Sequence, residues 1–267
     1  MGVINVTPDS FSDGGLHLDD AAAVAAGRAM IDQGADLVDI GGESTRPGAE
    51  AVPAIEELRR VIPVVEALVA AGAVVSIDTS KPEVARAALD AGAEIVNDVT
   101  AASTPGMTDV LGETGAGVVL MHMKGTPRTM QREPTYDDVV GEVAAFLDTK
   151  AQLVIDAGVA PAAVAIDPGI GFGKTVTHNL ELIGGLALLA GMGFPVVLGT
   201  SRKAFLGRVA RIEDPARRDG VTAVTTALGF ERGARVFRVH DVVSSRAALS
   251  IAAAIVSPQQ WDEWSQD

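Results

Sequence analysis

Residues 73–99 read AVVSIDTSKPEVARAALDAGAEIVNDV and contain the unit from which the rest of the chain is built. Two short apolar runs, 73–78 and 94–99, are rich in Val and Ile, which is typical of buried parallel strands. Between them an alanine-rich segment with helical spacing covers 82–91 and ends just before Gly92. A strand, a helix and a second strand in this order predict a βαβ unit around a parallel sheet.

The same alternation continues through the chain and predicts eight strands and eight helices. The strands are expected at 1–6, 36–41, 73–78, 94–99, 117–123, 164–167, 195–200 and 235–240. The helices are expected at 19–33, 53–71, 82–91, 106–114, 136–157, 178–191, 215–232 and 242–256. Glycines lie between helix ends and following strands, at Gly34, Gly72, Gly92, Gly115, Gly158, Gly193 and Gly233. Uninterrupted repetition favours a closed α/β fold, the (β/α)8 TIM barrel, over a doubly wound open sheet.

The composition excludes several classes of protein. Among 267 residues, 35 Asp and Glu oppose 21 Lys and Arg, a net charge of −14, so neither nucleic acid nor an anionic membrane is expected as a partner. Cysteine is absent, which rules out disulfides, thiolate metal sites and cysteine nucleophiles. No apolar run approaches the ~20 residues of a membrane span and no signal peptide is visible, so we expect a cytoplasmic protein. The length fits one barrel, and we predict a single domain over 1–267.

Polar side chains end most of the predicted strands, although buried parallel strands are normally apolar. They are Asn5, Asp39, Asp78, Asn97, Asp98, His122 and Asp167. Asp78, Asn97 and Asp167 are acceptors suited to a flat heterocycle rich in N–H donors. Because side chains alternate along a strand, Asn97 and Asp98 point in opposite directions, so only one of them is expected in a site. The polar loops after the strands meet at the C-terminal face of a barrel, where such folds carry their chemistry.

Basic residues are expected at the same rim. They are Arg46, Lys174, Arg202, Lys203, Arg238 and His240. In an acidic chain such a cluster, with the hydroxyls of Thr45 and Ser201, suits a phosphorylated or carboxylated substrate. The glycine-rich run GIGFGK at 169–174 lacks the spacing of a phosphate-binding P-loop. The histidines have no metal-ligand spacing, whereas Mg²⁺ held by an amide oxygen, waters and substrate phosphates is compatible with the sequence.

Eight segments of the chain, taken together, form a recognisable series of motifs. They are MGVINVTPDSFSDGG at 1–15, DIGGESTRPGA at 39–49, SIDTSKPEVA at 76–85, VND at 96–98, LMHMKGTPRTMQ at 120–131, DPGIGFGKT at 167–175, GTSRKAFLG at 199–207 and RVHDV at 238–242. In this order they resemble the signature segments of the dihydropteroate synthases, over almost the whole chain. The resemblance implies a folate-pathway transferase that joins p-aminobenzoate to 6-hydroxymethyl-7,8-dihydropterin diphosphate, giving 7,8-dihydropteroate and pyrophosphate.

The resemblance also implies the roles of individual residues. Catalytic roles fall to Asp78, Asp167, Lys203, Arg238 and His240. The pterin is expected on Asp78, Asn97, Met121, Asp167, Phe172, Lys203 and Arg238. The diphosphate is expected on Asn5, Arg46, Arg238 and His240, with Asn5 also holding Mg²⁺. The p-aminobenzoate pocket is expected to use Thr45, Arg46, Pro47, Phe172, Ser201 and Lys203.

The implied chemistry needs no general base before attack. The exocyclic CH2–O bond beside an electron-rich dihydropterin can ionise first, so we hypothesise a dissociative substitution in which Asp78 and Asp167 stabilise the developing cation. Mg²⁺, Arg238 and His240 stabilise the departing pyrophosphate. The resemblance further implies a homodimer through the last helices, and sulfonamides as competitors of p-aminobenzoate. Whether this chain is sensitive or resistant to them stays open.

Two other functions stay open from the sequence alone. A methyltetrahydrofolate:corrinoid methyltransferase would share the Asp and Asn contacts but needs no diphosphate site, so the segments at 201–203 and 238–240 argue against it. A non-catalytic pterin-binding paralogue is expected to lack Asn5, Arg238 and His240, and all of these are present. The chain departs from the family in one respect, because members usually carry several residues before the MGVINV strand, often a hairpin that plugs the barrel floor.

Overall fold

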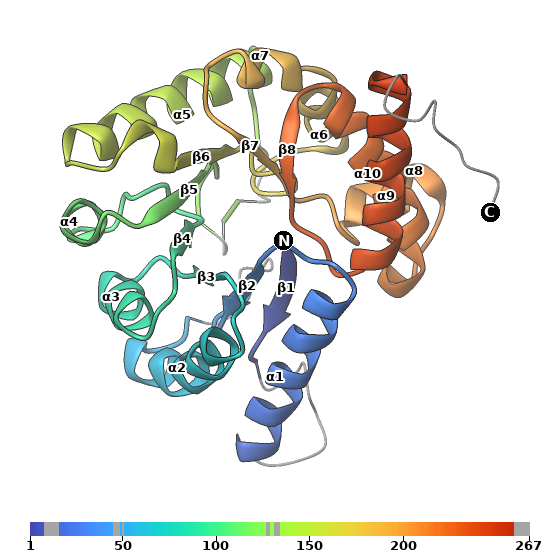
Figure 1. Cartoon of the computed structure of the whole chain (residues 1–267). Coiled ribbons are helices and arrows are strands. Elements are labelled where there is room, and N and C mark those ends of the chain that lie inside the picture. Colours follow the sequence, from blue (N-terminus) through green and yellow to red (C-terminus); the bar gives the residue numbers. More distant parts are fainter. Residues whose placement is uncertain (8–15, 45–48, 50, 127–128, 131–133, 259–267) are drawn as a thin grey trace.

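The computed structural model describes residues 1–7, 16–44, 49, 51–126, 129–130 and 134–258. The strands are β1 Gly2–Asn5, β2 Val38–Gly41, β3 Val75–Asp78, β4 Ile95–Asp98, β5 Gly117–Met121, β6 Val164–Asp167, β7 Val196–Leu198 and β8 Ala234–Phe237. They form one parallel eight-stranded sheet in sequence order, around the centre of Figure 1.

The two edges of this sheet meet. Gly2 of β1 forms a parallel bridge with Val239, just after β8. The Val3 amide donates to the Val239 carbonyl at 3.1 Å, and the Val239 amide donates to the Met1 carbonyl at 3.0 Å. These bonds close the ring, and the (β/α)8 barrel predicted from the sequence is confirmed.

Helices surround the strands (Figure 1). The α-helices of the described residues are α1 Leu16–Asp32, α2 Ala54–Ala70, α3 Pro82–Asp90, α4 Met107–Thr114, α5 Val139–Asp156, α6 Val176–Gly184, α7 Leu186–Ala190, α8 Ala204–Ala210, α9 Asp219–Glu231 and α10 Val242–Val256. Two short 3₁₀ turns are η1 Pro161–Ala163 and η2 Pro215–Arg218. None of the helices in the described ranges is both long and apolar enough to cross a lipid bilayer.

Alternation along the strands separates the core from the interior of the barrel. Ile40 of β2 and Ile77 of β3 are fully buried and share a core cluster with Val61 and Leu68 of α2. These strand residues therefore face the helices. Their immediate neighbours in the sequence, such as Asp78, consequently face the inside of the barrel.

The turns from helix to strand follow the glycine prediction. All seven predicted glycines have a positive φ, between 67° and 110°. An L-residue with a Cβ adopts this left-handed conformation only at a steric cost, so glycine closes each helix cheaply and starts the next strand after a short turn. The prediction at these positions is confirmed.

Three predicted elements differ from the structure. The helix expected at 178–191 is divided into α6 and α7, because Gly185 interrupts the α-helical conformation between them. The helix expected at 215–232 starts at Asp219, after the 3₁₀ turn that begins with Pro215. The stretch 201–214 lies between the strand expected at 195–200 and the helix expected at 215–232, and no helix was expected in it. It contains α8, a short helix whose flanking charged residues hid its apolar side in the sequence.

Candidate active site

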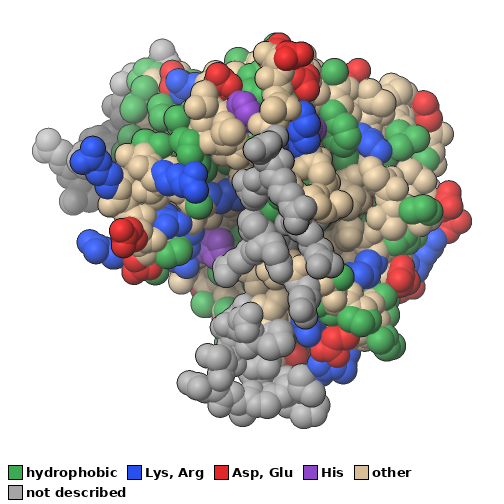
Figure 2. Space-filling view, turned by 180° about the vertical axis from the view of Figure 1, so that it is seen from behind, with side chains coloured by type: hydrophobic (Ala, Val, Ile, Leu, Met, Phe, Trp, Pro, Cys, Tyr) green, Lys and Arg blue, Asp and Glu red, His purple; other side chains and the backbone are tan. Residues whose placement is uncertain are grey.

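The barrel ends at one face in a cluster of acidic, amide and basic side chains. The N-terminus lies at the near end of β1 in Figure 1, so Figure 2, seen from behind, shows the end at which the strands stop. Lys, Arg and His side chains appear there beside the atoms drawn in grey. The geometry of the described residues at this mouth decides whether the predicted site exists.

Arg238 joins the end of β8 to strands on the other side of the seam. Its Nε donates to Asp39 Oδ2 at 2.6 Å, and its Nη2 donates to Asp78 Oδ2 at 2.7 Å. Asn97 Nδ2 donates to the same oxygen of Asp39 at 3.0 Å. Two predicted pterin-binding residues, Arg238 and Asn97, thus share the Asp39 carboxylate, and Arg238 connects a third, Asp78.

That carboxylate, Asp39, received no role from the sequence, although it was noted as a polar strand end. It is completely buried, and its second oxygen, Oδ1, has no hydrogen-bond partner among the described residues. Ser76, its register partner on β3, is also completely buried with an unpaired hydroxyl in that part of the chain. The available signal was an acidic residue in the middle of a strand predicted to be buried on both faces.

Asp98 behaves as alternation requires. Its oxygens accept hydrogen bonds from the Thr100 and Ala102 amides at 2.7 and 2.8 Å. It therefore caps the turn after β4, while the preceding residue, Asn97, bonds to Asp39 inside the barrel. The expectation that only one of this pair belongs to the site agrees with this geometry.

Asp167 and Lys203 converge with Arg238 from β6, β7 and β8. A Cβ built on Gly199 would lie 3.8 Å from Lys203 Nζ, 3.9 Å from Arg238 Cβ and 3.9 Å from Asp167 Oδ2. One short stretch of backbone therefore has all three side chains as neighbours. The three residues share one mouth and do not open onto separate surfaces.

The glycine-rich loop after β6 is bound to these residues. Asp167 Oδ1 accepts from the Gly169 amide at 2.7 Å, and Lys203 Nζ donates to the Ile170 carbonyl. The same ammonium lies 4.8 Å from the ring centroid of Phe172, a cation–π distance. The loop thus presents an aromatic face beside Lys203, as a site for a flat ring requires.

His240 and Ser201 link the last two strand ends. Ser201 Oγ lies 2.8 Å from His240 Nδ1 and accepts from the His240 amide at 3.1 Å. Ser201 is buried, whereas His240 is partly exposed. This pair brings a predicted p-aminobenzoate residue next to a predicted diphosphate residue.

Lys174 is not the exposed rim cation that the sequence suggested. It is buried, its Nζ lies 2.9 Å from His122 Nδ1, and it donates to the Phe172 carbonyl at 3.0 Å. Burial lowers the pKa of Lys174 to about 7, and burial followed by the Lys174 charge lowers the pKa of His122 to about 3. Lys174 therefore stabilises the glycine-rich loop through its hydrogen bond to the Phe172 carbonyl.

Arg202 also has a partner outside the mouth. Its guanidinium forms two 2.7 Å hydrogen bonds with the Asp219 carboxylate at the start of α9. The Asp219 carboxylate therefore pairs with the guanidinium that the sequence suggested would bind an anionic substrate. Arg202 bonds to α9, whereas its neighbours Ser201 and Lys203 bond to His240 and to the Ile170 carbonyl.

The remaining predicted residues have the following positions. Asn5 is the last residue of β1, is partly buried, and is the register partner of Gly41, which pairs in turn with Asp78. Met121 is buried at the end of β5, opposite Asp167 in the register. Three predicted residues lie outside the described residues. These are Thr45, Arg46 and Pro47.

Burial shifts the ionisation of the charged residues at the mouth. Desolvation raises the pKa of Asp78, although the Arg238 charge opposes the shift. Desolvation likewise raises the pKa of Asp167, with Lys203 as the main opposing charge. Desolvation lowers the pKa of Lys203 to about 8, against the attraction of Asp167. A ligand whose donors and acceptors pair with these three charged side chains offsets part of the desolvation free energy of burying them.

The backbone at Gly169 provides a test of the loop geometry. Gly169 has φ +66°, and a Cβ there would lie 1.8 Å from the His122 carbonyl oxygen. Gly169→Ala is therefore expected to displace the loop and with it Asp167, lowering kcat/KM about 100-fold, the loss that a shift of about 1 Å produces. Gly193→Ala is the matched control, because Gly193 has φ +90° with nothing near its Cβ position. Thermal melts should show a Tm loss from backbone strain in both variants, larger in Gly169→Ala because of the additional clash. Steady-state kinetics should show an activity loss in Gly169→Ala alone.

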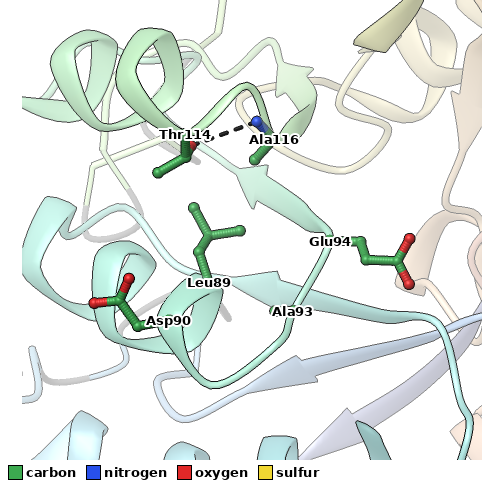
Figure 3. A pocket seen from close by; sticks show the side chains of 6 residues that line it. All are labelled: Leu89, Asp90, Ala93, Glu94, Thr114 and Ala116. Atoms are coloured by element: carbon green, nitrogen blue, oxygen red, sulfur yellow. Dashed lines mark hydrogen bonds between the residues drawn. The ribbon is translucent and has the colours of Figure 1, made fainter.

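A pocket at the opposite end of the strands does not compete with this site. It lies at the turns that lead into β4 and β5, between α3 and α4 (Figure 3). It is lined by Leu89, Asp90, Ala93, Glu94, Thr114 and Ala116. It contains none of the predicted site residues and no basic side chain that could bind an anionic ligand.

Comparison with known proteins agrees with this mouth. The family model described as pterin binding enzyme matches residues 1–240. The curated dihydropteroate synthase of Mycobacterium leprae is 47% identical over 261 residues, covering 95% of this chain and 92% of its own length.

Solved structures extend this similarity to the fold. The dihydropteroate synthase of Xanthomonas albilineans with 4-aminobenzoic acid has a TM-score of 0.91 and 48% identity, over 96% of this chain and 92% of the other. The Yersinia pestis dihydropteroate synthase in a sulfonamide drug complex has a TM-score of 0.91 and 41% identity, over 96% and 94%. The family model spans all eight strands, and the chain belongs to the pterin-binding enzyme family and, within it, to the dihydropteroate synthases.

Proposed function

We propose that the mouth of the barrel condenses 6-hydroxymethyl-7,8-dihydropterin diphosphate with p-aminobenzoate in folate biosynthesis, using the residues expected from the sequence. One observation carries this assignment. Asp78, Asn97 and Asp167, three acceptors from three strands, share one mouth with Lys203 and Arg238. The acceptors match the N–H groups of a pterin. Lys203 and Arg238 lie where ring atoms and anionic oxygens need donors, and Met121 and Phe172 complete the pterin pocket.

The leaving group is assigned to the basic side of the mouth. Arg238 and His240, with Arg46 from outside the described residues, bind the diphosphate oxygens. Within the described ranges no three acidic or imidazole side chains are grouped to hold a metal ion. A Mg²⁺ ion held largely by substrate phosphates fits that arrangement, with the Asn5 amide oxygen at the end of β1 as its protein ligand. When bound, Mg²⁺ offsets negative charge on the diphosphate.

The reaction begins with loss of pyrophosphate. The exocyclic C–O bond breaks and its electron pair leaves with the diphosphate, so a positive charge is delocalised over the dihydropterin. Asp78 and Asp167 stabilise this charge, while Arg238 and His240 stabilise the departing anion. The arylamine nitrogen then attacks the CH2 carbon and releases one proton. No side chain has to deprotonate the amine before attack, because the cation forms first.

The second substrate is assigned to the side of the mouth formed by Ser201, Lys203 and Phe172. The ring of p-aminobenzoate stacks near Phe172, and its carboxylate lies near Ser201 and Lys203. Thr45, Arg46 and Pro47 complete this pocket. Sulfonamides, which have the same aniline shape, compete for it.

Pyrophosphate release tests this function. The purified protein should release pyrophosphate from the pterin diphosphate only when p-aminobenzoate and Mg²⁺ are both present, and sulfanilamide should inhibit competitively with p-aminobenzoate. Methyl transfer from methyltetrahydrofolate to a corrinoid would instead support the methyltransferase alternative. Binding of the pterin without turnover would support the non-catalytic paralogue.

The pH profile follows from the ionisation of Lys203. Lys203 carries its positive charge, and donates charge-assisted hydrogen bonds, only while protonated, and burial lowers its pKa to about 8. We therefore expect kcat/KM to fall as pH rises through about 8. Lys203→Arg should move this alkaline limb beyond pH ~10, because a guanidinium keeps its proton there. An unchanged limb in Lys203→Arg would assign the titration to another group.

The homodimer expected from the sequence is supported by an apolar surface on the last helices. Exposed side chains of α9 and α10 include Val224, Leu228, Val243, Ile251 and Ile255. The two helices pack against each other, so these residues belong to neighbouring elements. Light scattering, with Ile251→Glu to disrupt the surface, tests the dimer. The single domain over 1–267 and the cytoplasmic location stay predictions, testable by limited proteolysis and cell fractionation.

A further inference from the structure

The turn between β7 and α8 carries Ser201 and Lys203 into the mouth, and the residue between them is strained. Arg202 has φ +58°, in the left-handed region. A non-glycine residue costs roughly 1–2 kcal/mol in this conformation and persists there only when the surroundings enforce it. Such positions cluster at functional sites, so the contacts that enforce this one are informative.

Arg202 is held at its side chain and on both sides of its backbone. Its guanidinium binds the Asp219 carboxylate through two 2.7 Å hydrogen bonds. Its amide donates to Thr222 Oγ1 at 3.2 Å, and its carbonyl accepts from Arg218 Nη1 at 2.9 Å. Asp219 and Thr222 belong to α9, and Arg218 directly precedes it.

Arg218 is itself fixed. It is buried, its Nε donates to the Ile212 carbonyl at 3.1 Å, and its Nη2 donates to the Glu213 carbonyl. One guanidinium therefore connects the turn at Arg202 with the end of the loop that leads back to α9. The turn cannot change conformation without breaking the bonds to the buried Arg218 and Thr222 and to the partly exposed Asp219.

The left-handed conformation at Arg202 sends its neighbours in the opposite direction from its own side chain. Ser201 lies against His240, and Lys203 reaches the Ile170 carbonyl beside Phe172. A change of the φ angle at Arg202 would rotate Lys203 relative to Ser201 and so alter the spacing of the two side chains. The contacts that hold Arg202 therefore bear on the geometry inside the mouth.

We infer that Asp219 and Arg218 are positioning residues for the p-aminobenzoate subsite, acting through the left-handed turn at Arg202. The inference rests on the proposed function, because that function gives Ser201 and Lys203 their substrate. Neither positioning residue is among those assigned to bind substrate. Lys203 keeps its bond to the glycine-rich loop when the turn loosens, so the p-aminobenzoate side of the mouth is more sensitive than the pterin side.

Asp219→Asn tests this inference, since it keeps the side-chain volume but removes the charge and one acceptor. We expect KM for p-aminobenzoate to rise about tenfold, while KM for the pterin diphosphate changes less than twofold. Asp214→Asn is the matched control: Asp214 lies on the same loop and caps η2 by accepting from the Ala216 amide at 2.9 Å, and its charge acts on Arg202 less than that of Asp219 does. This control should have both KM values of the wild type.

A second pair of variants separates backbone positioning from charge. Arg202→Gly and Arg202→Ala both remove the ion pair, but glycine adopts the left-handed conformation at no steric cost. We expect KM for p-aminobenzoate to be at least fivefold lower in Arg202→Gly than in Arg202→Ala. Equal values would show that only charge matters and would overturn the inference. This comparison remains decisive if Asp219→Asn fails to fold.

The outcomes distinguish the two proposals. If the wild type releases pyrophosphate with both substrates but Asp219→Asn behaves as Asp214→Asn, the positioning role is wrong and the proposed function stands. If the wild type releases none, the proposed function fails, and the positioning role fails with it. A Tm loss in Asp219→Asn with unchanged KM values would mean a purely structural role and would also overturn the inference.

Discussion

Replacing Lys203 with alanine is expected to lower kcat/KM for the condensation about a thousandfold without unfolding the chain. The ammonium is a charged donor in a largely dehydrated mouth, and it bonds to the Ile170 carbonyl beside Phe172. Removing one preorganised donor from such an environment typically costs 10²- to 10³-fold in rate, and Lys203 is assigned to both substrates. Asp167→Ala should cause a comparable loss, because Asp167 is assigned to stabilise the cation.

The measurement is steady-state pyrophosphate release with both substrates varied. Lys150→Ala is a suitable control: Lys150 is a lysine on α5 whose Nζ donates to Ser103 Oγ at 2.8 Å, away from the mouth. It should retain wild-type kinetics. Circular dichroism should show the same helix content in all of these variants. Near-normal rates in both Lys203→Ala and Asp167→Ala would refute the site assignment.

Asp39→Ala is expected to lower the free energy of unfolding by about 3–5 kcal/mol and to abolish most of the activity. Asp39 is completely buried and accepts hydrogen bonds from Arg238 and Asn97. Removing one partner of a buried ion pair typically has an effect of this size, and here Arg238 would lose one of its two carboxylate partners. Arg238 would retain only its bond to Asp78 among those described, and both site residues would lose their fixed orientation.

Urea denaturation measures this loss, and Ser76→Ala is its matched control. Ser76 is the register partner of Asp39 and equally buried, but its hydroxyl has no partner among the described residues. Removing it should change stability by less than about 1 kcal/mol, because no protein hydrogen bond is lost. Equal effects of the two substitutions would mean that Asp39 contributes through packing and not through its charge.

The fold was predictable because its signals are local. Each unit repeats an apolar run, a helical segment and a glycine, and the glycines at the turns adopt the conformation that their position required. The errors are local too. Gly185 divides one expected helix, and α8 was hidden because its few apolar residues lie between charged ones.

The sequence predicted which residues belong to the site, but not which of them form hydrogen bonds and ion pairs with one another. Asp78, Asn97 and Asp167 end strands in the sequence, so a barrel had to bring them to one face. The role of Asp39 depends on Arg238, which is 199 residues away along the chain, and no local pattern encodes that contact. The partner of Arg202 could not be predicted for the same reason, since choosing between a substrate anion and Asp219 requires the direction of the turn.

The closure of the ring between Gly2 and Val239 has a consequence for the protein during its synthesis. Arg238 arrives with the last strand, yet its carboxylate partners belong to the second and third strands. A nascent chain that has left the ribosome only as far as β7 therefore lacks the guanidinium that pairs with Asp39 and Asp78. The final unit both closes the cylinder and supplies this residue of the binding pocket, so chains truncated before it should bind no pterin.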